Sequence, residues 1–150
     1  MQSSTTESST KIVSDKIATE AKKPVSCKNN TYGEGDERNK YITYTANKLI
    51  ENGFDNWKDI LATFQQEGDW QAGALNTANS NGTHDSGLCQ LNSAYHSKFI
   101  ESEDFKDPYK QIDYCVSVAV DAKNKNRPIG KVWYGYANRS KHIEKFECTT

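Results

Sequence analysis

The aromatic residues divide this chain of 150 residues into two unequal parts. All three Trp, eight Tyr and five Phe lie at or after Tyr32. Residues 1–26 hold six Ser and four Thr among scattered charges, and such a stretch cannot bury enough apolar surface to offset its ordering entropy. We therefore predict a flexible tail or linker over residues 1–26, which processing could also have left, and one globular domain over residues 27–150.

Charge and hydropathy narrow the classes of function open to the domain. Nineteen Lys and Arg against twenty Asp and Glu give a net charge of −1, which argues against nucleic acid as a partner. No apolar run approaches the ~20 residues that cross a bilayer, so we expect no integral membrane segment. The first ten residues lack the apolar stretch of a signal peptide, although an exported protein could have lost one before this numbering begins.

Apolar spacing predicts a mostly helical domain. Hydrophobic residues recurring at intervals of three and four predict a helix over residues 41–51 and a second helix for which Asp55 is the N-cap. Asp107, followed by Pro, opens a third helix, which the run of Arg, Pro, Ile and Gly at 127–130 ends.

The remaining elements are expected to be short. Asn, Ser, Thr and Gly crowd residues 76–84 and predict a loop or β-turn. Strand signal is confined to the region of residues 75–91. A last short helix is expected to hold Val132, Trp133 and Tyr136, so the predicted fold class is α+β and mostly helical.

Glu67 lies near the end of the second predicted helix and is followed by Gly68. A carboxyl at the edge of a core is partly buried, and burial disfavours its charge and raises its pKa. A carboxylic acid that is still protonated near neutral pH can act as a general acid. Taken alone, a Glu at a helix end is more often a solvated one.

Two further segments carry candidate chemistry. The polar run 79–93 leads from turn-forming residues into a short apolar stretch, and it presents Asp85 as a second carboxylate at an edge suited to sugar binding. The segment 132–139 carries three aromatic rings, which in sugar-binding sites stack on the C–H faces of pyranose rings. Taken alone, Asp85 fits an Asx-type turn and the aromatic segment fits core packing.

In this order the three segments resemble the lysozyme-like superfamily, which includes c-type lysozymes and lytic transglycosylases. Residues 87–93 read Gly-Leu-Cys-Gln-Leu-Asn-Ser, similar to Gly-Ile-Leu-Gln-Ile-Asn-Ser in c-type lysozymes and to Gly-Leu-Met-Gln-Ile in transglycosylases. Residues 133–139 read Trp-Tyr-Gly-Tyr-Ala-Asn-Arg, similar to the c-type run Trp-x-x-Trp-x-Asn-Arg. Glu67 and Asp85 are 18 positions apart, close to the family's separation. The resemblance covers about residues 39–141.

The resemblance implies a lysozyme-like fold, with a helical body, a small β-hairpin lobe and a substrate cleft between them. It implies cleavage of the β-1,4 bond between N-acetylmuramic acid and N-acetylglucosamine in peptidoglycan. Glu67 would protonate the leaving oxygen, and Asp85 would stabilise the oxocarbenium-like state or attack as a nucleophile; lysozyme is the type case of this mechanism. A hydrolytic muramidase is favoured over two alternatives, a lytic transglycosylase and a non-catalytic sugar-binding module.

The resemblance also implies the surroundings of the two carboxylates. Gln90, Asn92 and Tyr95 would line the sugar sites together with Tyr136, and Trp133 would pack against the acid. No metal or organic cofactor is implied. The expected partner is a peptidoglycan glycan strand, and the expected state is a monomer outside the cytosol, whether extracellular, periplasmic or virion-associated.

Four cysteines permit three pairings, and they lack the spacing of a zinc site. Cys27 and Cys148 flank the domain, and the resemblance implies that they form a terminal bridge. Cys89 and Cys115 lie on apolar stretches, and the superfamily's architecture implies that they meet in the core, where two free buried thiols are the alternative. C-type lysozymes carry eight Cys and a basic surface, so four Cys and a near-neutral charge favour a bacterial or phage relative.

Overall fold

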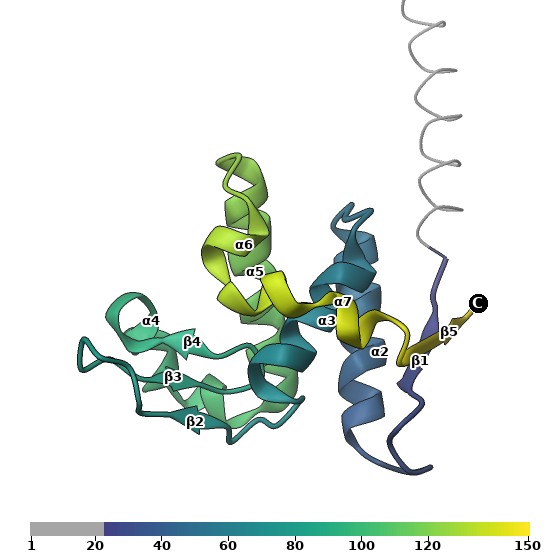
Figure 1. Cartoon of the computed structure of the whole chain (residues 1–150), viewed down its shortest axis with the longest axis horizontal. Helices are drawn as coiled ribbons and strands as arrows, with labels where there is room; N and C mark the ends of the chain where they lie inside the picture. Colours follow the sequence, from purple (N-terminus) through teal and green to yellow (C-terminus); the bar gives the residue numbers. More distant parts are fainter. Residues whose placement is uncertain (1–22) are drawn as a thin grey trace, which may run out of the picture.

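The computed structural model describes residues 23–150, and in this part of the chain the protein is a mostly helical α+β domain with two small antiparallel sheets (Figure 1). The predicted fold class is confirmed at that level. In chain order the elements are β1 (Ser26–Asn29), α2 (Arg38–Glu51), α3 (Trp57–Gly68), β2 (Leu75–Asn76), β3 (Asp85–Ser86), β4 (Leu91–Asn92), α4 (Ser93–Ile100), η1 (Glu103–Lys106), α5 (Pro108–Asn124), α6 (Ile129–Val132), η2 (Tyr134–Asn138), α7 (Ser140–Ile143) and β5 (Phe146–Thr149).

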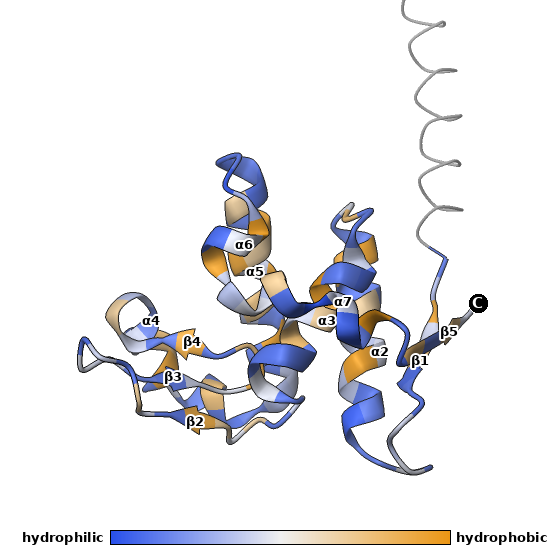
Figure 2. Ribbon diagram, in the orientation of Figure 1, coloured by the Kyte–Doolittle hydropathy of each residue, from blue (hydrophilic) through white to orange (hydrophobic). Residues whose placement is uncertain are grey.

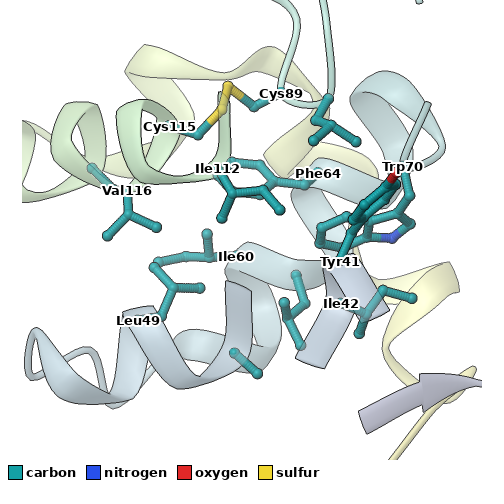
Figure 3. Close-up of a cluster of buried hydrophobic side chains, with 14 of the residues drawn as sticks. Tyr41, Ile42, Leu49, Ile60, Phe64, Trp70, Cys89, Ile112, Cys115 and Val116 are labelled. Carbon is teal, nitrogen blue, oxygen red and sulfur yellow. A yellow bond between two sulfur atoms is a disulfide. The ribbon is translucent and has the colours of Figure 1, made fainter. Parts of the chain in front are cut away.

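The core lies between α2, α3 and α5. Leu49 of α2, Ile60 and Phe64 of α3, and Ile112 of α5 are fully buried there (Figure 3). These are residues that the three- and four-residue spacing assigned to the inner faces of helices. In Figure 2 these helices carry hydrophobic residues among hydrophilic ones, and the strands β2 and β4 each combine one Leu with one Asn.

Both implied disulfides are present. Cys89 and Cys115 are bonded above the core, next to Ile112 in Figure 3, and this bridge joins the β3–β4 turn to α5. Cys27 and Cys148 are bonded where β1 pairs with β5 in antiparallel register. No free cysteine remains among the residues that the structure describes. The terminal bridge therefore joins the two ends of the described domain.

The sheet of β1 and β5 was not predicted, because strand signal was expected only near residues 75–91. Most of the predicted tail, residues 1–22, lies outside the described residues. Its last residues belong to the fold, since Val25 exchanges two backbone hydrogen bonds with the side-chain amide of Asn47, at 2.8 and 2.9 Å, and Ser26 begins β1. The domain boundary thus falls before Val25.

The second sheet is a three-stranded antiparallel one in the order β2-β3-β4. Asp85 of β3 lies opposite Asn76 of β2 on one side and opposite Asn92 of β4 on the other. Each strand has only two residues, so side-chain hydrogen bonds and the adjoining turns contribute much of the order of this lobe. This sheet is the part of the fold that carries Asp85.

The helix predictions hold with corrected ends. The helix expected over residues 41–51 begins at Arg38, and Asp55 is not the N-cap of α3, because that helix begins at Trp57 with Asn56 in the cap position. Asp107 does cap α5, with its carboxylate accepting a hydrogen bond from the backbone N–H of Tyr109 at 2.9 Å. None of the described helices is long and apolar enough to span a membrane.

The prediction of a single short helix that holds Val132, Trp133 and Tyr136 is wrong. Trp133 is extended, with φ −126° and ψ 114°, and it separates α6 from the 3₁₀ helix η2. Its indole is buried and donates a hydrogen bond to the Cys89 carbonyl at 2.8 Å. A continuous helix would turn this side chain away from that carbonyl, so tertiary packing overrides the helical pattern.

Candidate functional site

The acid candidate, Glu67, lies in the last turn of α3. The helix ends at Gly68, and the next two residues, Asp69 and Trp70, both have left-handed backbones, with φ of 50° and 58°. Gly68 has no room for a side chain, because a Cβ there would lie 2.6 Å from the carbonyl oxygen of Leu88. The helix end therefore contacts the turn that follows β3, which brings Glu67 toward Asp85.

The carboxylate of Glu67 is held by the backbone of η2. The N–H of Gly135 donates a hydrogen bond to Oε1 at 2.8 Å, and a Cβ on Gly135 would lie 2.7 Å from the same oxygen. Only glycine lets the two approach so closely. The aromatic segment singled out in the sequence thus reaches the acid through a main-chain N–H.

The electrostatics favour a protonated Glu67. Burial is the largest influence and raises the pKa of this carboxyl above its ordinary value, and the nearby negative charge of Asp85 raises it further. The hydrogen bond from Gly135 acts in the opposite direction, because it stabilises the carboxylate. The net shift is upward, so Glu67 keeps its proton to a higher pH than an exposed Glu does.

Asp85 lies in a contrasting setting, among side-chain amides. Asn92 donates a hydrogen bond to Oδ1 at 2.9 Å, and Asn79 donates one to Oδ2 at 3.1 Å. Asn76 donates a longer one to Oδ2 at 3.4 Å. The register of the β2-β3-β4 sheet places two of these amides directly opposite Asp85. Three N–H donors pair with a negative carboxylate and stabilise its charge.

The predicted sugar-site residues do not share one role. Gln90 has φ 54° and donates through its amide to the carbonyls of Gly87, at 3.0 Å, and Ala74, at 3.2 Å, so it braces the turn between β3 and β4. Asn92 binds Asp85 and also accepts a hydrogen bond from the N–H of Ala94 as the N-cap of α4.

The three aromatic candidates differ in exposure. Tyr95 is 85% exposed, whereas Trp133 is 4% exposed and its ring packs edge-on against Phe64 with centroids 5.0 Å apart. The buried indole therefore has little surface left for a sugar. Tyr136 is half-buried and lies under the guanidinium of Arg139, 3.6 Å from the ring centre.

One functional neighbour was missed from the sequence: the buried amide of Gln65, two residues before the acid. Its Oε1 accepts hydrogen bonds from Asn29 at 2.9 Å and from the indole of Trp70 at 2.8 Å. Its Nε2 donates to the hydroxyl of Tyr32 and to Asp69. These contacts fix the end of α3. The available signal was a pair of Gln residues, 65 and 66, that directly follows the apolar Phe64 and precedes the acid.

Other features of the described residues lie apart from this pair. No group of three or more His, Cys, Asp or Glu within residues 23–150 could hold a metal ion. A hollow of about 870 Å³ is formed by β1, the segment that follows it and the outer face of α2, with Lys28, Tyr44 and Tyr109 among its walls. Neither carboxylate lines that hollow.

Comparison of the chain with protein-family models, with curated proteins and with solved structures finds no match. The two carboxylates and the residues that hold them are therefore the features that bear on function. Glu67 is half-buried with a raised pKa, and Asp85 accepts hydrogen bonds from asparagine amides. Chemically, such a pair can deliver a proton and stabilise a developing positive charge in a single step.

Proposed function

We propose that this protein is a peptidoglycan-cleaving muramidase with a lysozyme-like fold. It would hydrolyse the β-1,4 bond between N-acetylmuramic acid and N-acetylglucosamine. The observation that carries the proposal is the unlike setting of two carboxylates in one site, Glu67 half-buried on the Gly135 N–H and Asp85 held by asparagine amides. Glycosidases use such a pair as general acid and as nucleophile or counter-charge.

In the proposed reaction Glu67 donates its proton to the glycosidic oxygen as the bond from that oxygen to the anomeric carbon breaks. The negative carboxylate of Asp85 stabilises the oxocarbenium-like sugar or bonds to its anomeric carbon. Glu67, now a carboxylate, takes a proton from water, and the hydroxide adds to the anomeric carbon. Both carboxyl groups return to their starting states, and no cofactor enters.

A lytic transglycosylase is the second candidate, and the motif at residues 87–91 supports it, since it resembles the transglycosylase form as well. In that reaction the C6 hydroxyl of the muramic residue replaces water and closes a 1,6-anhydro ring. Glu67 would serve both reactions. The three amides on Asp85 favour the hydrolase, because a stabilised anion under the sugar is what a retaining hydrolase requires.

The proposal places the protein outside a reducing cytosol. Two disulfides, Cys27–Cys148 and Cys89–Cys115, are typical of proteins made for oxidising surroundings. A glycan strand of the cell wall is the proposed partner, and the extracellular space, the periplasm or a virion is the proposed location, with the protein acting as a monomer.

The test is digestion of purified peptidoglycan, followed by turbidity and by mass analysis of the released fragments. A muramidase clears the suspension and leaves muramic residues with reducing ends. Anhydro-muramic ends, one water lighter, would show the transglycosylase instead. Binding without any release of fragments would overturn both and leave the sugar-binding module. Glu67→Gln is the matched control, since it preserves the shape of the side chain and removes the acid.

A further inference from the structure

Three large apolar side chains stand out as exposed among the described residues. They are Leu75, Tyr95 and Tyr134, which are 63%, 85% and 86% exposed. Single exposed hydrophobic residues are ordinary on a protein surface. What distinguishes these three is their position relative to the carboxylates.

Each of the three adjoins a residue that holds Glu67 or Asp85. Leu75 directly precedes Asn76, and Tyr95 follows Asn92 by three residues, and both asparagines bind Asp85. Tyr134 directly precedes Gly135, whose N–H binds Glu67. Leu75 points to the opposite face of the β2-β3-β4 sheet from Asn76, because side chains alternate along a strand. The two tyrosines are therefore the exposed rings attached close to the residues that hold the carboxylates.

The position of Tyr134 can be bounded closely. Peptide geometry sets its Cα about 2.4 Å from the nitrogen of Gly135, and that nitrogen is 2.8 Å from Oε1 of Glu67. The Cα of Tyr134 therefore lies within about 5 Å of the acid's oxygen. Because the ring is almost fully exposed, neither the core nor a neighbouring side chain covers it.

We propose that Tyr134 is a stacking platform for the N-acetylhexosamine on the leaving-group side of the scissile bond. This rests on the proposed function. The acid protonates the leaving oxygen, so the departing sugar lies on the Glu67 side, where Tyr134 is attached. Tyr95, tied through Asn92 to Asp85, faces the sugar that keeps the anomeric carbon. The two tyrosines thus bind opposite sides of the bond.

A tyrosine ring suits this ligand for a physical reason. The C–H face of a pyranose is apolar and flat enough to cover an aromatic ring, while the phenol hydroxyl stays in water. Tyr is also among the residues that carry most of the binding free energy at recognition surfaces. Tyr134 contributes almost nothing to the core, so its exposure is not a packing requirement.

The test is cleavage of hexa-N-acetylchitohexaose labelled at its reducing end, which is the leaving-group end. Tyr134→Ala should raise KM about tenfold, as loss of a binding hot spot does. It should also shorten the labelled fragments, since fewer sugars are then held on the leaving side. Tyr95→Ala should lengthen them. Tyr134→Phe, which keeps the ring, should recover most of the loss, and Tyr44→Phe, on the outer face of α2, is the control.

The opposite shifts in fragment length would support the proposal, and a Tyr134→Ala protein with the wild-type fragments and KM would overturn it. If the wild-type protein leaves the hexasaccharide intact, peptidoglycan digestion decides the proposed function, and binding decides the present proposal separately. In the Glu67→Gln protein with ¹³C-labelled tyrosine, the hexasaccharide should shift the ring signal of Tyr134, assigned by its loss in Tyr134→Ala. Saturation without any shift at that ring would overturn the platform.

Discussion

The C-terminal end of α3 and the β2-β3-β4 sheet each present one carboxylate, but they hold it by different means. Glu67 is half-buried at the edge of an aromatic and aliphatic core, with one backbone N–H as its hydrogen-bond donor. Asp85 lies on the central strand of a small sheet and accepts hydrogen bonds from side-chain amides of both neighbouring strands and of the loop. The first setting raises the pKa of its carboxyl through burial, and the second supplies hydrogen-bond donors to both carboxylate oxygens.

One fold thus gives two carboxyl groups different surroundings by placing one at the end of a helix and the other on a short sheet. A helix that ends against the core supplies apolar surroundings and few donors. A short polar sheet supplies donors at fixed register. The predictions below remove one of these supports at a time, starting with the largest expected effect.

Replacing the acid should have the largest effect. Glu67→Gln keeps the side chain's shape and its acceptor oxygen for Gly135 but cannot donate a proton, and general acid catalysis contributes ~10²–10⁴-fold. We expect peptidoglycan cleavage to fall by that factor while the circular dichroism spectrum stays unchanged. A folded variant with near-native rates would remove Glu67 from the mechanism.

The same variant tests the burial of the acid through stability. A carboxyl whose pKa is raised by folding binds its proton more tightly in the native state, so ionisation at higher pH destabilises the fold. The stability of Glu67→Gln relative to wild type should therefore rise as pH increases from about 4 toward neutral, because an unfolded Glu, with a pKa of about 4.3, ionises before the folded one does. Urea denaturation at several pH values measures this difference, and a constant difference would mean that Glu67 is not destabilised when charged.

The aromatic support comes next. Trp133→Ala removes a buried indole that packs on Phe64 and binds the Cys89 carbonyl, and loss of a core Trp costs ~3–5 kcal/mol. We expect a large fall in the melting temperature and, where the variant still folds, a lower pKa of Glu67 as water enters. Trp133→Phe should lose less stability. An unchanged pH–rate profile in a folded Trp133→Ala protein would show that Trp133 does not influence the pKa of Glu67.

On the sheet, two asparagines of one loop make a matched pair. Asn79 and Asn81 both bind Thr83, but only Asn79 donates to Asp85. Loss of a hydrogen bond to a charged group costs about 1.5 kcal/mol, which corresponds to roughly tenfold in rate. We expect kcat to fall about that much in Asn79→Ala and to stay near wild type in Asn81→Ala. Equal effects in the two variants would mean that the hydrogen bond from Asn79 to Asp85 does not contribute to kcat.

The smallest effect is expected from a pair of tyrosine hydroxyls. Tyr32 donates a hydrogen bond to Asp69 at 2.6 Å, whereas Tyr44 donates one to Asp113 at 2.7 Å on the outer side of α2. In each case burial is the main cause that raises the pKa of the phenol to about 12. Only the Tyr32 hydroxyl also accepts from Gln65 near the acid.

We therefore expect Tyr32→Phe to cost about 1 kcal/mol of stability and to move the acid limb of the pH–rate profile, because the end of α3 loses part of its support. Tyr44→Phe should leave that profile in place. Thermal denaturation and pH–rate profiles of both variants check the difference. A profile that moves equally in both, or in neither, would show that the Gln65 contacts do not position Glu67.

The helices and the two candidate carboxylates could be predicted from the sequence, whereas most of the residues that hold the carboxylates in place could not. Apolar spacing predicted α2 and α5, because a buried helical face requires that pattern. Glu67 and Asp85 were singled out by the resemblance of three segments taken together, since each residue alone fits an ordinary surface role. The pairing of cysteines could be implied only by a resemblance, since four Cys leave three pairings open.

The parts that were missed depend on contacts between distant residues. β1 and β5 have four residues each, too few for a clear strand pattern. β1 is held by side chains of α2, among them Thr43, which binds both the N–H and the carbonyl of Cys27. Trp133 is extended because its indole reaches the Cys89 carbonyl, 44 residues away along the chain. Gln65 has its partners 36 and 33 residues earlier in the chain, at Asn29 and Tyr32. The pattern of neighbouring residues in the sequence gives no information about partners so far away in the chain.

The proposed mechanism depends most on the raised pKa of Glu67, which burial and the nearby Asp85 both increase. The most direct measurement is an NMR titration of the Glu67 side-chain carboxyl carbon, in wild type and in Asp85→Asn, with the signal assigned by its loss in Glu67→Gln. We predict a pKa above the ordinary value for Glu in wild type and a lower one in Asp85→Asn, which loses the neighbouring negative charge but keeps the burial. A wild-type Glu67 that titrates like an exposed Glu, with no response to Asp85→Asn, would contradict the account.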